Sequence, residues 1–232
     1  MVDPAPAPGA GAGAKGQVRI EEPDRAERAV ARRSAETRAT VPDLDLSIDV
    51  DMGACLELGA SQPGTVIAML TRACALALRD FPRANGAYRD GRLELYSRVN
   101  IGVTVAAPDI YATPTVFDCD RKSLEELGRE ISDLALRAGA GELAAPELAG
   151  ATFTLSHPGE LGVAAATPVL VAPQAAAVAA GAIRDLAVVR NETVVPGHAM
   201  TITLVCDHRI LYGWHAARFL EAIGTRLERP SF

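Results

Sequence analysis

Apolar and polar residues alternate strictly between residues 44 and 50, and this alternation constrains the fold more than any other feature of the sequence. The apolar positions are Leu44, Leu46, Ile48 and Val50, and the polar positions between them are Asp45, Ser47 and Asp49. Successive side chains of a strand point to opposite faces, so a period of two predicts a β-strand with one buried face. The chain must therefore build a sheet that has an apolar layer against one side.

Several segments have the spacing of apolar residues that is typical of helices. Residues 65–81 carry apolar side chains at intervals of three and four, which predicts a helix that faces the core. The same spacing predicts helices over residues 121–137 and 214–227, and a further helix is expected over residues 25–40. Helices of this kind can supply the apolar layer that the sheet requires.

Short apolar runs between these helices are typical of further strands. The dipeptide Asp90–Gly91 predicts a tight hairpin turn, because both residues tolerate positive φ angles. The remaining strands are expected at residues 99–107, 152–156, 168–171, 175–183 and 201–206. Because strands and helices do not alternate regularly, the order favours an α/β fold with an open mixed sheet backed by helices over a barrel or a doubly wound fold.

The composition is that of one sizeable globular domain. The chain has 232 residues, of which 49% are hydrophobic, and its net charge is -6. It has no basic stripe, so we expect neither nucleic acid nor an anionic membrane as a partner. No apolar run approaches the roughly 20 residues that a membrane-spanning helix requires. We therefore expect a cytoplasmic protein that binds small molecules or other proteins.

The N-terminal segment differs in composition from the rest of the chain. Residues 1–16 are nearly all Ala, Pro and Gly, which cannot bury enough apolar surface to offset the loss of chain entropy. We expect a flexible linker over residues 1–24 and one folded domain over residues 25–232.

The four cysteines are scattered along the chain without the spacing of a metal site, and no metal is expected. They are Cys55, Cys74, Cys119 and Cys206. Free cysteine behaves mostly as a small buried hydrophobic residue, so we expect reduced thiols within the core.

His208 lies between the apolar strand of residues 201–206 and the helix of residues 214–227. Loops at strand ends often carry catalytic residues. Position alone leaves two other interpretations open. The ring could be satisfied by Asp207 or by its own backbone, or it could form a thiol–imidazole pair with Cys206, which shares a strand face with it.

Residues 207–213 read Asp-His-Arg-Ile-Leu-Tyr-Gly. They resemble the Asp-His-Arg-x-x-Asp-Gly signature of the dihydrolipoyl acyltransferases, which are the acyltransferase cores of 2-oxoacid dehydrogenase complexes and belong to the chloramphenicol acetyltransferase-like superfamily. Further segments are similar to this family and follow in the family's order: Val41–Pro42, Asp49–Met52, Val99–Val103, Asp120–Leu124, Thr152–Ser156 and Pro173–Ala176. Several ordered segments make the resemblance far more specific than one short motif.

The resemblance implies a fold and an assembly. The fold is a two-layer chloramphenicol acetyltransferase-like sandwich over residues 25–232. Such domains assemble as homotrimers, often further into cubic or icosahedral cores, and each active site lies between neighbouring subunits. Other subunits of a 2-oxoacid dehydrogenase complex would then be partners.

The resemblance also implies an enzyme that moves an acyl group between a dihydrolipoyl carrier and coenzyme A. His208 would be the general base that deprotonates the attacking thiol, because the thiolate is the nucleophile. Ser156 would come from the facing subunit and donate to the oxyanion, so that no acyl-enzyme is required. Asp207, Arg209, Tyr212 and Gly213 would shape the site.

The sequence departs from the family pattern at three places. Tyr212 stands where the family has the Asp of its Asp-Gly pair, and a neutral tyrosine cannot supply the anion that fixes the turn. His157 stands where an Asn is common. Residues 109–114 replace a more apolar loop that begins with glycine. These changes could weaken the activity or alter the substrate channel.

No lipoyl-bearing domain is recognisable in these residues, so we expect the lipoyl group from another domain or in trans. Two alternatives remain open. One is a stand-alone acyltransferase that uses coenzyme A with another acceptor. The other is a weakly active trimeric scaffold of a multienzyme complex, in which Tyr212 reflects the decay of the site.

Overall fold

The computed structural model of the chain describes residue 16 and residues 18–59, 65–107, 110–190 and 192–231. The predicted linker over residues 1–24 lies largely outside these residues and stays a prediction. The first residue of the loop at 109–114 also lies outside them.

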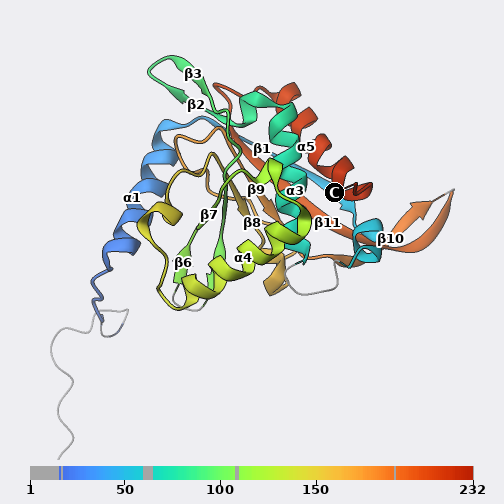
Figure 1. Ribbon diagram of the computed structural model, residues 1–232, viewed down its shortest axis with the longest axis horizontal. Coiled ribbons are helices and arrows are strands. Elements are labelled where there is room, and N and C mark those ends of the chain that lie inside the picture. Colours follow the sequence, from blue (N-terminus) through green and yellow to red (C-terminus); the bar gives the residue numbers. More distant parts are fainter. Residues whose placement is uncertain (1–15, 17, 60–64, 108–109, 191, 232) are drawn as a thin grey trace, which may run out of the picture.

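A seven-stranded sheet forms the centre of the molecule (Figure 1). Its strands in spatial order are β1 (Asp43–Asp51), β11 (Thr193–Asp207), β9 (Ala176–Ala180), β8 (Phe153–Ser156), β4 (Ile101–Val103) and β7 (Thr115–Val116), and β10 (Arg184–Arg190) pairs with β11. Strand β8 is parallel to both of its neighbours, β9 and β4, and the other pairs are antiparallel. The predicted α/β class with a mixed sheet is confirmed.

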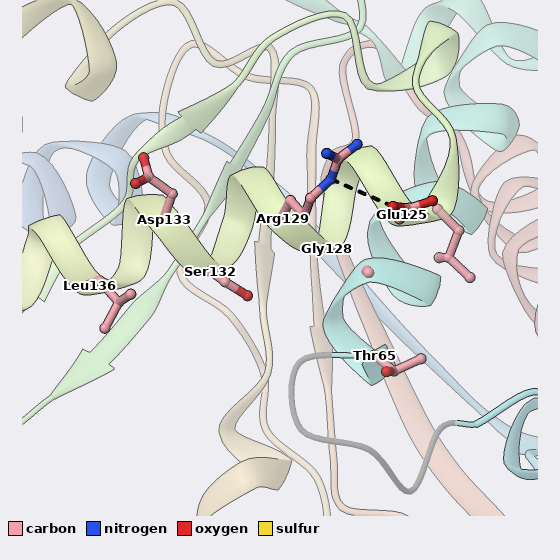
Figure 2. A pocket seen from close by; sticks show the side chains of 9 residues that line it. Thr65, Glu125, Gly128, Arg129, Ser132, Asp133 and Leu136 are labelled. Atoms are coloured by element: carbon pink, nitrogen blue, oxygen red, sulfur yellow. Dashed lines mark ion pairs between the residues drawn. The ribbon is translucent and has the colours of Figure 1, made fainter.

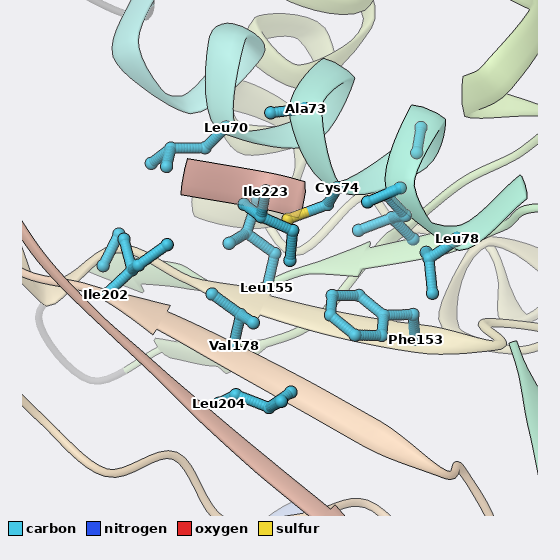
Figure 3. Close-up of a cluster of buried hydrophobic side chains, with 14 of the residues drawn as sticks. Leu70, Ala73, Cys74, Leu78, Phe153, Leu155, Val178, Ile202, Leu204 and Ile223 are labelled. Atoms are coloured by element: carbon cyan, nitrogen blue, oxygen red, sulfur yellow. The ribbon is translucent and has the colours of Figure 1, made fainter. Parts of the chain in front are cut away.

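Three long helices form the second layer, against one face of this sheet. They are α3 (Thr65–Asp80), α4 (Leu124–Gly139) and α5 (Gly213–Glu228). Side chains of α3 and α5 meet those of the sheet in a fully buried cluster that includes Leu70, Phe153 and Ile223 (Figure 3). The alternation in β1 has the predicted effect, because Val50 is buried against the helices while Asp45 and Asp49 are exposed.

Shorter elements and two hairpins surround these layers. The helices are α1 (Arg25–Thr40), α2 (Gly53–Glu57) and the 3-10 turns η1 (Pro82–Ala84), η2 (Cys119–Arg121), η3 (Ala145–Leu148) and η4 (Pro158–Leu161). The hairpins are β2 (Gly86–Arg89) with β3 (Arg92–Leu95) and β5 (Val105–Ala107) with β6 (Ile110–Ala112). In the first hairpin Asp90 and Gly91 have φ values of 48° and 74°, which confirms the predicted turn.

Capping residues decide where two of the helices begin. Asp24 accepts from the backbone of Glu27, and the Glu27 carboxylate accepts from the backbone of Asp24, so α1 begins at Arg25 as predicted. Ser123 and Glu126 form the same reciprocal pair before α4. The prediction that this helix starts at residue 121 was wrong by three residues, because Arg121 belongs to the 3-10 turn η2.

The expected single strand over residues 99–107 is divided in the structure. Strand β4 belongs to the main sheet, whereas β5 leaves it and pairs with β6. Thr104 lies between the two, and its amide still donates to Leu155 of β8 at 2.9 Å. An apolar run predicts an extended chain, but the partner of each strand is fixed by residues far away in the sequence.

The expected strand over residues 168–171 was wrong, since this segment has no strand pairing. Its apolar character serves a different purpose. Leu170 is buried in a small cluster with Val41, Ala177 and Val205, on the face of the sheet away from the three helices.

The strand expected over residues 201–206 is the last part of the much longer β11. Its first half pairs with β10 in a hairpin that projects from the sheet (Figure 1). This half contains Pro196 and Gly197, two residue types that are more common in turns than in strands. The sequence therefore did not predict a strand there. Gly197 is needed there, because a Cβ at this position would lie 2.6 Å from the side chain of Val188.

Candidate functional site

His208 occupies the turn between the end of β11 and the start of α5. Its backbone amide donates to the carbonyl of Pro42 at 2.9 Å, which ties the turn to the start of β1. Its ring is exposed and meets the ring of Tyr212 edge-on, with the centroids 6.0 Å apart. Among the described residues this ring forms no hydrogen bond. An unpaired, accessible imidazole can take a proton from a bound substrate.

Asp207 pairs with Arg209 and not with the His208 ring. The buried Asp207 carboxylate accepts from the backbone amide of Arg209 at 2.9 Å, from its Nε at 2.9 Å and from its Nη2 at 2.7 Å. These hydrogen bonds raise the pKa of the Arg209 guanidinium above its ordinary value. The interpretation in which Asp207 satisfies the histidine is therefore wrong, and the pair instead holds both neighbours of His208 in place.

Tyr212 is the residue before the first turn of α5, and its side chain does not cap the helix. The tyrosine is half exposed, and its ring contacts the rings of both His208 and His215. The centroids of the Tyr212 and His215 rings are 6.2 Å apart. The exposed ring of Trp214 contacts His215 in turn. Gly213 is the first residue of the helix. A Cβ there would meet open space, so a larger side chain would fit at this position.

Ser156 lies at the carboxyl end of β8, in the centre of the sheet. Its hydroxyl is 3.0 Å from the Thr104 hydroxyl, which lies 3.5 Å from that of Thr113. His157, the next residue, is held by its Nδ1, which lies 3.0 Å from the carbonyl of Ala180. The sequence reasoning missed Thr104 and Thr113. The one signal for Thr104 was a hydroxyl residue within the largely apolar run of residues 99–107.

The topology separates Ser156 from His208 within one chain. Ser156 pairs with Ala179 of β9, and Ala179 pairs on its other side with Thr203 of β11. His208 follows Thr203 by five residues in the direction opposite to β8. At about 3.3 Å per residue, this places the two residues roughly 17 Å apart along the strands alone. A site that uses both must therefore take them from different chains.

Cys206 is not suited to be a nucleophile. It is fully buried, and its thiol donates to the carbonyl of Leu211 at 3.6 Å. Burial raises the pKa of the Cys206 thiol to about 12, and nearby Asp207 acts in the same direction. The thiol therefore stays protonated near neutral pH. All four cysteines are free and buried, as the sequence predicted.

A groove of about 730 Å³ lies between α3 and α4 (Figure 2). Neither His208 nor Ser156 lines it. Two of its charged residues, Glu125 and Arg129, pair with one another along α4 at 3.9 Å, and the third, Asp133, pairs with Arg137 at 2.9 Å. Such exposed pairs are typical of a solvated helix face. Across the described ranges there is no cluster of His, Cys, Asp and Glu that could hold a metal ion, and no helix long and apolar enough to cross a membrane.

Residues 16–232 match the family model of the 2-oxoacid dehydrogenases acyltransferase catalytic domain. The dihydrolipoyllysine-residue acetyltransferase component of the pyruvate dehydrogenase complex from Rhizobium meliloti is 33% identical over 220 residues, which cover 89% of this chain and 49% of the relative. The chain spans about half the length of the curated relatives it matches.

Solved structures agree with the fold. The dihydrolipoamide acetyltransferase of Azotobacter vinelandii superposes with a TM-score of 0.89 at 26% identity, over 97% of both chains. The cubic core of a pyruvate dehydrogenase multienzyme complex gives 0.89 at 27% identity, again over 97% of both chains. A chloramphenicol acetyltransferase gives 0.51 at 16% identity over 84% of this chain and 94% of its own, and shares the fold alone.

The Azotobacter enzyme was studied for the role of a serine, a histidine and an asparagine in its catalytic mechanism. Its serine precedes its histidine by 52 positions, the same separation as between Ser156 and His208. Its asparagine follows the histidine by four positions, and Tyr212 stands at that separation here. The departure noticed in the sequence thus falls on a position of interest in the relative.

Proposed function

Because this chain belongs to the 2-oxoacid dehydrogenase acyltransferase family and contains its catalytic domain, we propose that it transfers an acyl group between a dihydrolipoyl thiol and coenzyme A. One observation carries the proposal. The chain presents an exposed His208 ring without a hydrogen-bond partner among the described residues at one end of the sheet and the Ser156 hydroxyl at the opposite end. Their separation in sequence equals that of the serine and histidine studied in the Azotobacter enzyme.

The mechanism follows from the chemistry of thioester exchange. A thiol with a pKa near about 8.5 is mostly protonated at neutral pH, so a base must remove its proton. Neutral His208 takes that proton, and the thiolate forms a new bond to the thioester carbonyl carbon. The carbonyl oxygen becomes negatively charged and accepts a hydrogen bond from the Ser156 hydroxyl. When the intermediate collapses, the other carbon–sulfur bond breaks and the leaving thiolate recovers the proton from His208.

The separation of the two residues supports an assembly in which neighbouring chains complete each site. We propose a homotrimer, the smallest ring in which every chain can give His208 to one neighbour and receive Ser156 from the other. A larger cubic or icosahedral core and association with other subunits of a 2-oxoacid dehydrogenase complex are compatible with this trimer. The lipoyl group would come from another domain or in trans, and a cytoplasmic location stays a prediction.

The proposal is tested by mixing two inactive variants. Purified wild-type protein is expected to convert acyl-CoA and dihydrolipoamide into free coenzyme A. His208→Ala and Ser156→Ala, each alone, should lose most of this activity. Co-expressed with different tags and isolated as mixed trimers, they should recover about a third of wild-type turnover, because one of the three interfaces in each mixed trimer pairs an intact histidine with an intact serine.

Mixed trimers of wild-type size that recover no activity would contradict the shared site. The matched control pairs His208→Ala with the double variant His208→Ala/Ser156→Ala, a combination in which no interface regains a histidine. The stand-alone and scaffold alternatives gain no support from the comparisons. An inactive wild-type protein that still forms large assemblies would restore the scaffold.

A further inference from the structure

The ring of Tyr88, on strand β2, lies under the guanidinium of Arg209. The carbon at the centre of the guanidinium is 4.6 Å from the ring centroid, a distance at which a cation is attracted to the negative face of an aromatic ring. The edge of the same guanidinium faces Asp207, and its Nη1 donates to the carbonyl of Thr40 at 3.3 Å. Tyr88 thus covers one face of a group whose edges are already bonded.

Tyr88 can hold Arg209 in place because its own hairpin is attached to the sheet. The amide of Ala175 donates to the carbonyl of Gly86 at 2.8 Å, and Ala87 forms a bridge with Gln174. The amide of Asp207 donates to the carbonyl of Ala175 at 2.9 Å. The hairpin, the start of β9 and the end of β11 therefore form one hydrogen-bonded unit.

In sequence, His208 lies between Asp207 and Arg209, the two residues that this hydrogen-bonded unit holds in place. The Asp207 carboxylate is buried and depends on Arg209 for its side-chain partners. If the guanidinium left its place, the carboxylate would be unsatisfied and the turn would change shape to find another donor. The orientation of the His208 ring toward a substrate depends on that turn.

We propose that Tyr88 is a positioning residue for His208, acting through the face of its ring on Arg209 and through the Arg209–Asp207 pair. The inference rests on the proposed function. It adds a residue from a separate hairpin, far from the signature motif in sequence, to the parts that set the geometry of the base. Tyr88 acts on the turn and not on the reacting atoms.

The test compares two substitutions of Tyr88. Tyr88→Leu keeps an apolar side chain of substantial size but removes the aromatic face, whereas Tyr88→Phe keeps the face and removes only the hydroxyl. We expect Tyr88→Leu to lower kcat about five- to tenfold with KM for both substrates changed by less than about twofold. Tyr88→Phe should retain kcat within about twofold of wild type. Tyr96→Leu, at the other end of the same hairpin, is the matched control and should leave kcat within about twofold.

Three other results would overturn the inference. A wild-type kcat in Tyr88→Leu would show that the ring does not act on the turn, and an equal loss in Tyr88→Phe would show that its hydroxyl matters instead. A raised KM with unchanged kcat would make Tyr88 a substrate contact in the hollow of about 360 Å³ that it shares with Arg209 and Gln174. An inactive wild-type protein would instead contradict the proposed function. Melting temperatures of Tyr88→Leu and Tyr96→Leu identify a loss that comes from unfolding of the hairpin.

Discussion

The two ends of the central sheet hold their candidate catalytic residues in different ways. At the carboxyl end of β8, the Ser156 hydroxyl is bonded to Thr104, and the strand lies between two parallel neighbours. At the end of β11, the His208 ring is exposed and is in contact with the ring of Tyr212. The first group is oriented by a side-chain hydrogen bond, whereas the second is held through its backbone, its two neighbours in sequence and the edge-on contact with Tyr212.

This difference is consistent with the tasks proposed for the two groups. A donor to an oxyanion acts best when its direction is set before the reaction begins. A base that exchanges a proton with two different thiols must be accessible, and a ring already paired with Asp207 would be less free to do so. The comparison predicts that the site is sensitive to side-chain contacts near Ser156 and to the shape of the turn near His208.

The largest effect is expected from the substitution of His208, the exposed residue at the end of β11. His208→Ala should lower turnover by at least about 100-fold, because the variant lacks the base that takes the thiol proton in the proposed mechanism. Steady-state kinetics with acyl-CoA and dihydrolipoamide provide the measurement. His198→Ala, which removes an exposed histidine at the base of the β10–β11 hairpin, is the control and should retain activity. Unchanged turnover in His208→Ala would exclude the general-base mechanism.

A smaller effect is expected when Ser156 loses the neighbouring hydroxyl of Thr104. Thr104→Val keeps the shape of the side chain but removes the hydroxyl that lies 3.0 Å from Ser156. We expect kcat to fall about fivefold, since the loss of one orienting hydrogen bond corresponds to about 1 kcal/mol. Thr104→Ser restores the hydroxyl and should restore most of the rate. Equal rates for the Val and Ser variants would show that Ser156 needs no orienting partner.

Tyr212 provides a modest test of the turn. Aspartate at this position can cap α5 by accepting from the amides of its first turn, which the tyrosine does not do. Tyr212→Asp should therefore stabilise the protein by about 1 kcal/mol and raise its melting temperature by about 2–4 °C. Turnover should also rise by a few fold if the tyrosine is a defect.

Tyr212→Ala is the control for this substitution, since it removes the ring without adding a cap. A lower activity in Tyr212→Asp, despite the higher melting temperature, would mean that the tyrosine is adapted to a different substrate.

The smallest effect is expected at Cys206, two residues from His208. A buried thiol whose pKa is raised to about 12 does not act as a nucleophile near neutral pH. Cys206→Ala should change kcat by less than about twofold, although a lower melting temperature is expected from the lost packing. A large loss of kcat in a folded variant would revive the thiol–imidazole pair.

The sequence by itself determined the local elements of this protein and predicted two candidate site residues, His208 and Ser156. The alternation in β1, the Asp90–Gly91 turn and the spacing of apolar residues in α3 depend on neighbours within a few positions, so they are readable from the chain alone. His208 belongs to this group, because its strand, its turn and its helix are consecutive.

Only the tertiary structure decided which strands pair and which side chains meet. Thr104 joins Ser156 from 52 residues away, Arg209 pairs with Asp207 and stacks on Tyr88 of a distant hairpin, and Pro196 continues a strand in spite of its usual role. Such contacts depend on the order of strands in the sheet, which burial of the whole apolar layer fixes and no short window of sequence contains. For the same reason, only the sheet topology revealed that Ser156 and His208 lie at opposite ends of one chain.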